Sequence, residues 1–221
     1  LGSDIVITNF DQQKSYETVP IAVGDTLLQE LGDLEGVRQV QRYSTKPGMI
    51  MTDDNFLGMV LKGVSSEYNF DFLNRHMVEG EIPVFSDTVS SNLVLVSKTI
   101  ADKLQVKTGE RLYTYYIEGK NVRARRLEIA GIYQTNFTQY DDLFLITDLY
   151  TVNRLNAWEP QQVSGVELEV EDYNHLDEVY ERVCGQVDMK TDAFGNTYYV
   201  QTVEETNVQI FAWLDLLDMN V

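Results

Sequence analysis

The pattern of apolar and polar positions predicts the same order of elements near each end of the chain. Each end has a strand-like run, then a stretch with apolar residues every three to four positions, then a second strand-like run. The predicted elements are strands at 5–7 and 36–40 around a helix at 25–34, and strands at 166–170 and 198–203 around a helix at 176–187. Two β-α-β units of this kind predict a split βαβ sheet with its helices on one face.

The middle of the chain has short strand patterns separated by turns. The predicted elements are strands at 92–96, 112–117, 122–132 and 143–146, and helices at 97–104 and 147–155. Ser97 is a plausible N-cap of the first of these helices, and residues 118–121 connect two strands as a hairpin turn. The sequence therefore predicts an α+β fold with a β-rich insertion, residues 48–160, in a split βαβ subdomain made of residues 1–47 and 161–203.

The last stretch of the chain begins as a strand and continues with helical spacing. A helix start with Trp213 beside Phe211 favours a membrane–water interface, because the indole ring is amphipathic. An ordinary amphipathic helix packed on the core is the alternative. The chain also opens without an initiator methionine or a signal peptide. We therefore expect a domain looped out between two other elements, with residues 204–221 starting a membrane-entering helix and Asn207, Phe211 and Trp213 next to the membrane.

The amino-acid composition of the chain limits the classes of partner that it can bind. The chain has 35 acidic and 17 basic residues and a formal net charge of -18. Nucleic-acid binding needs clustered cations that displace phosphate counterions, so we expect no nucleic-acid partner. The acidity also disfavours a domain that lies flat on anionic lipid. The single Cys184 excludes an internal disulfide and a thiolate metal cluster, and it leaves the cellular compartment open.

Few residues favour catalysis. The two histidines lie far apart in sequence, and no glycine-rich phosphate loop is present. The acid pairs at 53–54 and 141–142 are the candidates for a carboxylate hydrolase. Adjacent residues of an extended chain point to opposite sides, however, so neither pair forms a dyad by itself. We expect no catalytic residues, no metal site and no cofactor, and the hydrolase stays as an alternative.

One segment is basic against this acidic background. Lys120, Arg123, Arg125 and Arg126 follow a tyrosine-rich run that ends at Tyr116. Cations on a strand edge discourage aggregation, which is one interpretation of the segment. Tyrosine and arginine are also enriched at protein interfaces, so the same five residues are candidates for binding a partner.

Three stretches resemble a known family of transporter domains. They are residues 61–64 with 70–83, residues 93–111, and residues 200–214. The second is similar to the signature LxLSxxxAxxLxVxxGD, with Glu110 in place of the usual aspartate. The third is similar to the passage VxTWxExNxxLFxxL, with Val203 in place of the tryptophan. On these residues the chain resembles the extracytoplasmic domain of ABC transporter permeases of the FtsX/MacB type, and within them the lipoprotein-releasing branch of LolC and LolE.

The resemblance implies an architecture and a set of partners. The split βαβ part would be the porter-like subdomain of the family, and the insertion would be its sabre-like subdomain. The protein would be the periplasmic domain of an inner-membrane permease, between the first and second of four transmembrane helices. Its partners would be a cytoplasmic ATPase subunit, a second permease protomer and lipoprotein cargo. The domain itself would perform no chemistry, because ATP would be hydrolysed on the other subunit.

The basic hairpin has a counterpart in this family. In LolC-like permeases a hairpin called the hook protrudes from the insertion and recruits a periplasmic lipoprotein carrier chaperone. By position, residues 116–126 would form it, although they lack the proline-rich tip of the hook. A LolE-like role, in which the domain receives lipoprotein, therefore stays open. So do a MacB-like exporter and, from another class, a free extracytoplasmic binding module.

Overall fold

The computed structural model describes residues 3–12 and 16–204. The chain divides into two compact units, the first made of Leu1–Arg42 and Gln161–Val221 and the second of Tyr43–Pro160. Strand β3 (Val37–Met51) begins in the first unit and continues into the second without a break. The predicted boundary at residue 47 therefore falls inside a strand, five residues later than the division between the two units.

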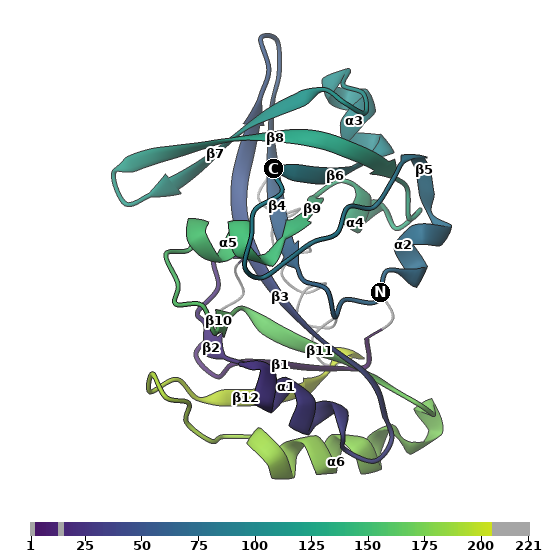
Figure 1. Ribbon diagram of the computed structural model, residues 1–221, viewed down its shortest axis with the longest axis vertical. Helices are drawn as coiled ribbons and strands as arrows, with labels where there is room; N and C mark the ends of the chain where they lie inside the picture. Colours follow the sequence, from purple (N-terminus) through teal and green to yellow (C-terminus); the bar gives the residue numbers. More distant parts are fainter. Residues whose placement is uncertain (1–2, 13–15, 205–221) are drawn as a thin grey trace, which may run out of the picture. The chain divides into compact units, whose positions relative to one another are not determined.

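The first unit is a split βαβ sheet (Figure 1). Its elements are β1 (Ile5–Asn9), β2 (Ile21–Ala22), α1 (Asp25–Gly32), the start of β3, β10 (Gln162–Val163), β11 (Gly165–Val170), the 3-10 turn η1 (Tyr173–His175), α6 (Leu176–Val187) and β12 (Tyr198–Thr202). The strand order is β12-β1-β11-β3, and β1 is antiparallel to both of its neighbours. Each β-α-β unit thus places one strand between the two strands of the other, which confirms the predicted topology.

Helices α1 and α6 lie side by side in this unit (Figure 1). Gln186 Nε2 donates to Glu30 Oε2 across 3.1 Å, and Arg182 donates to the Glu35 carbonyl oxygen across 3.0 Å. The helices bury apolar residues such as Leu31 and Val183, both without exposed surface. Amphipathic helices bury such a face against a sheet, so the core of the unit forms here.

The second unit contains a ring of hydrogen-bonded strands. Its elements are the rest of β3, β4 (Phe56–Val64), α2 (Asp71–Arg75), β5 (Met77–Gly80), β6 (Leu93–Ser97), α3 (Lys98–Leu104), β7 (Arg111–Glu118), β8 (Asn121–Tyr133), α4 (Thr138–Asp141), β9 (Phe144–Asp148) and α5 (Leu149–Leu155). The order β3-β4-β9-β6-β8 is closed by β7, which pairs with both β8 and β3. A sheet closed on itself is barrel-like and hides most strand edges.

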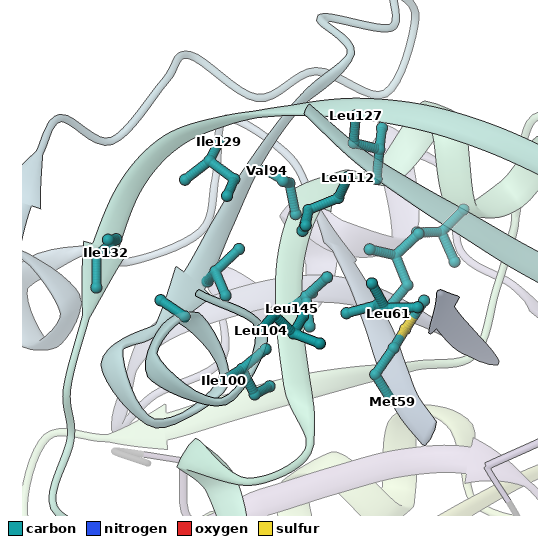
Figure 2. Close-up of a cluster of buried hydrophobic side chains, with 14 of the residues drawn as sticks. Met59, Leu61, Val94, Ile100, Leu104, Leu112, Leu127, Ile129, Ile132 and Leu145 are labelled. Atoms are coloured by element: carbon teal, nitrogen blue, oxygen red, sulfur yellow. The ribbon is translucent and has the colours of Figure 1, made fainter. Parts of the chain in front are cut away.

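Apolar side chains from the strands and two helices fill the core of the second unit (Figure 2). Leu61, Leu112 and Leu145 come from three of the strands, while Ile100 and Leu104 come from α3. Helix α3 begins where the sequence predicts, because Ser97 Oγ accepts the Ile100 amide across 3.1 Å as its N-cap. A smaller cluster around Phe85, Leu95 and Tyr133 is a second apolar core in the same unit.

Candidate functional site: the β7–β8 hairpin

Strands β7 and β8 form a long antiparallel ribbon, hereafter the β7–β8 ribbon, residues 111–128. Its pairing runs from Arg111 opposite Glu128 to Glu118 opposite Asn121, so the predicted hairpin is confirmed. Strand β7 pairs with β3 at Tyr115 and Thr114, which lie opposite Met49 and Ile50. The end of the ribbon therefore continues past the sheet and protrudes (Figure 1).

The two faces of the ribbon differ in exposure. Residues directly opposite each other share a face, and neighbours along a strand alternate. The inner face carries Leu112, Thr114 and Tyr116, which are buried, opposite Leu127, Arg125 and Arg123. The outer face carries Tyr113, Tyr115 and Ile117 opposite Arg126, Ala124 and Val122. At the end of this outer face, Ile117 and Val122 form an apolar pair that is 63% and 65% exposed.

Tyr116 belongs to the core, which corrects its assignment as a partner-binding residue. The side chain is 1% exposed, and its hydroxyl donates to Thr114 Oγ1 across 3.0 Å. Its ring packs on the backbone of β3, where a Cβ at Gly48 would lie 2.6 Å from Tyr116 Cε1. Burial raises the pKa of the Tyr116 phenol far above its usual range. A side chain enclosed in this way cannot contact a partner without local unfolding.

The four basic residues do not form one patch. Arg123 and Arg125 are half-buried on the inner face, and Arg123 Nη1 donates to the Arg154 carbonyl oxygen of α5 across 3.2 Å. Lys120 in the turn and Arg126 on the outer face are exposed. The strand period of two predicts this division, since residues 123 and 125 must share a face that residue 126 does not. Of these four residues, Lys120 and Arg126 are thus the two presented to solvent, and Arg126 lies two outer-face positions from Val122, with Ala124 between them.

Ile117 and Val122 are the candidate contact residues that the sequence reasoning missed. They form the cross-strand pair one position further from the hairpin turn than Glu118 and Asn121. A β-branched pair at a turn supports strand pairing, so the pattern by itself suggests a structural role. Both are also exposed and share the outer face with Arg126, and arginine is enriched at interfaces, so the pair is a candidate for contact with a partner.

The acid pairs serve turns in the structure. Asp141 is 1% exposed; its Oδ1 accepts the Thr135 amide and hydroxyl across 3.0 and 2.7 Å, and its Oδ2 accepts the Asn136 amide across 2.9 Å. Asp142 lies 3.9 Å from Lys103 Nζ. Residues 53 and 54 are exposed in the turn between β3 and β4. Among the described residues, no three histidine, cysteine or acidic side chains group as metal ligands would.

The predicted membrane-proximal residues Asn207, Phe211 and Trp213 lie outside the described residues. In the part of the chain that the structure describes, no helix has both the length and the apolar character needed to cross a membrane.

Comparison with known proteins decides the family. The model of the MacB-like periplasmic core domain matches residues 2–184 of the chain. The chain belongs to this family. It is thus the periplasmic or extracellular domain of an inner-membrane ABC transporter permease of the FtsX/MacB type, a class of permease that works with an ATPase. The resemblance found in the sequence is confirmed at this level.

Two solved structures share the fold. The extracellular domain of the noncanonic ABC-type transporter YknZ from Gram-positive bacteria is 14% identical, with a TM-score of 0.57 over 90% of this chain and 99% of that one. The periplasmic region of MacB from Actinobacillus actinomycetemcomitans is 10% identical, with a TM-score of 0.56 over 94% and 92%. Both support the α+β architecture. A search of the curated proteins gave no match.

Proposed function

We propose that this domain serves a lipoprotein-releasing permease and that its β7–β8 ribbon docks a periplasmic lipoprotein carrier chaperone. The observation that carries the proposal is the end of the ribbon, where Ile117 and Val122 are exposed between Lys120 and Arg126. Lys120 and Arg126 place two cations on the ribbon that carries this apolar pair, in a protein of net charge -18.

The chemistry of this surface suits an acidic partner with an apolar recess. Full burial of an isoleucine or valine side chain contributes about 1.5–3 kcal/mol each, so the pair can supply much of a transient interaction. Cations at the rim of a contact mainly raise the association rate and orient the partner. Lys120 and Arg126 would therefore select a negatively charged partner that the remaining surface of the domain repels.

In this proposal the domain performs no chemistry of its own. A cytoplasmic ATPase subunit hydrolyses ATP, and the permease transmits that motion to this domain and to the domain of a second permease protomer. Movement of the two domains then displaces a lipid-anchored cargo from the inner membrane towards the carrier. The exposed end of the ribbon is the place where the carrier is held for this transfer.

A MacB-like role in export or mechanotransmission is the second candidate, and the family match favours it. A lipoprotein carrier would then have no function at the ribbon. The two candidates differ in one measurable property, which is binding of the purified carrier to this domain.

The test is a titration of the domain with the purified carrier chaperone. The outer-face variant Lys120→Glu/Arg126→Glu should bind at least tenfold more weakly, because two attractive charges become repulsive. The matched control Lys98→Glu/Lys107→Glu makes the same change of charge at exposed positions of the second unit outside the ribbon and should bind as the wild type does. Equal weakening of both variants would indicate an effect of net charge alone and reject the docking site. No binding by the wild type would reject carrier docking and favour the MacB-like role.

A further inference from the structure

Three segments of the first unit meet beside the amino end of β1. The backbone amide of Asp4 donates to the Leu168 carbonyl oxygen of β11 across 2.8 Å. The carbonyl oxygen of Asp4 accepts the Val203 amide, which follows β12, across 2.9 Å. Asp4 Oδ2 accepts the Val170 amide across 2.9 Å. One residue therefore binds both neighbours of β1 at the point where β11 and β12 end.

A side-chain contact adds to this arrangement. Tyr173 follows β11 in η1, and its hydroxyl donates to Glu204 Oε1 in a short hydrogen bond. The tyrosine side chain is 55% exposed, and Glu204 is exposed as well. Burial therefore does not explain why these two groups meet, and a hydrogen bond between exposed groups contributes little to global stability.

The surrounding charges explain why a tyrosine is suited to the position. The hydrogen bond to Glu204 is the main cause that raises the pKa of the Tyr173 phenol, and the negative charges of Glu204, Asp4 and Asp177 raise it further. Asp4 and Asp177 are thus acidic neighbours of the pair, and an ionised carboxylate has no hydrogen to donate to Glu204. The neutral hydroxyl of Tyr173 is the donor that holds it there.

We infer that Asp4, Tyr173 and Glu204 form a clamp that fixes the residues following β12 to the end of β11, and that Tyr173 is its positioning residue. Without the side-chain contact, a displacement of Glu204 would reach β11 only through β12 and β1, which are paired along five positions. With it, the displacement also reaches η1 directly, and η1 leads into α6. The clamp therefore adds a direct connection between the residues after β12 and the start of α6. This inference uses membership in the permease family and does not depend on the cargo or the carrier.

The test follows amide hydrogen exchange in the full-length permease together with its ATPase, with and without ATP. In the wild type, ATP should change exchange in the peptide covering residues 173–187. Tyr173→Phe, which loses only the hydroxyl, should remove most of that change and speed exchange at residue 204 by about fivefold without nucleotide, while the Val203 amide stays bonded to Asp4. Glu204→Gln keeps an acceptor oxygen and should behave as the wild type does. Adding Glu204→Ala to Tyr173→Phe should have no further effect, since both remove the same bond.

Tyr180→Phe is the matched control. Its hydroxyl donates to the Val200 carbonyl oxygen inside β12, across 3.3 Å, and not to the residues after the strand. This variant should keep the ATP-dependent change in exchange. Loss of the change in both tyrosine variants would show a general effect of loosening the unit and overturn the clamp. An unchanged response in Tyr173→Phe, or a wild type without an ATP-dependent change at 173–187, would also overturn it.

Discussion

Replacing Gly63 with alanine measures how closely β4 packs against α5. A Cβ at residue 63 would lie 2.7 Å from Val152 Cγ2, 2.9 Å from Val152 Cβ and 3.0 Å from the Asp148 carbonyl oxygen. Non-bonded carbon atoms attract most strongly at about 3.5–4.0 Å, so the added methyl group requires a displacement of about 1 Å. Strand and helix cannot both keep their present positions with an alanine here.

Neither neighbour can move without a cost. Val152 has no exposed surface, and a valine in a helix has one strongly preferred rotamer. Asp148 is the N-cap of α5, where its Oδ1 accepts the Thr151 amide across 3.3 Å. Overpacking a core costs about 1–3 kcal/mol, and the lower entropy of the unfolded alanine chain offsets about 0.4–1 kcal/mol. We therefore expect Gly63→Ala to lose about 1–2 kcal/mol of unfolding free energy.

Gly58→Ala on the same strand is the matched control. A Cβ at residue 58 would meet no atom within 4 Å, so this variant should be unchanged or more stable by about 0.5 kcal/mol. Urea unfolding followed by circular dichroism gives both free energies. A thermal scan should place Gly63→Ala about 3–8 °C below the control. Equal unfolding midpoints for the two variants would refute the packing argument, because they would show that α5 yields freely.

Two further predictions concern the first turn of α3 and one buried tyrosine. Ser97→Ala removes the acceptor of the Ile100 amide and the donor to the Asp141 carbonyl oxygen, so urea unfolding should show a loss of about 1–2 kcal/mol. Ser97→Thr keeps the hydroxyl and should therefore lose much less unfolding free energy than Ser97→Ala. Equal losses in the two variants would contradict the capping role. Burial, with a smaller contribution from Asp192, raises the pKa of Tyr198 to about 12. This folded-state pKa lies above the unfolded value of about 10. The Tyr198 phenol therefore makes its full contribution to the free energy of unfolding below pH 10, and this contribution is lost as the pH rises towards 12. The free energy of unfolding of Tyr198→Phe should therefore fall less steeply between pH 10 and 12 than that of the wild type. Urea titrations at several pH values measure both slopes, and equal slopes would reject the linkage.

Elements with a clear local period were predictable from the sequence. Helix α6 has the predicted bounds of residues 176–187, and β11 and β12 differ from the prediction by one residue each. One face of the helix is apolar along its whole length, and the two strands have short apolar patterns, so neighbouring residues carry the information. The split βαβ topology followed because two such patterns in the same order have few ways to share a sheet.

Ring closure in the second unit could not be predicted in this way. It depends on the pairing of β7 with β3 at Met49–Tyr115 and Ile50–Thr114, between segments far apart in the sequence. No local period reports which strand becomes the neighbour of another. Strand β4 has no predicted bounds, since its later residues are buried on both faces and show no alternation.

The orientation of Tyr116 was undecided in the sequence for a related reason. The run from residue 113 to 116 is tyrosine and threonine throughout, so hydrophobicity does not alternate along it. What turns Tyr116 inward is the absence of a side chain at Gly48 on the adjacent β3, which leaves room for the ring. A contact between two strands decides the face, and the pattern within one strand does not contain it.

The two interpretations of the basic hairpin apply to different faces of the ribbon. Arg123 bonds to α5 and Arg125 shares its half-buried face, so this pair belongs to the fold and to the protection of the strand edge. Lys120 and Arg126 are exposed, the first in the turn and the second on the outer face that also carries Ile117 and Val122. Neutralising all four cations together would therefore mix a structural effect with a binding effect. A loss of carrier binding is informative about docking only when the inner arginines are left in place, which is why the outer pair alone should be changed.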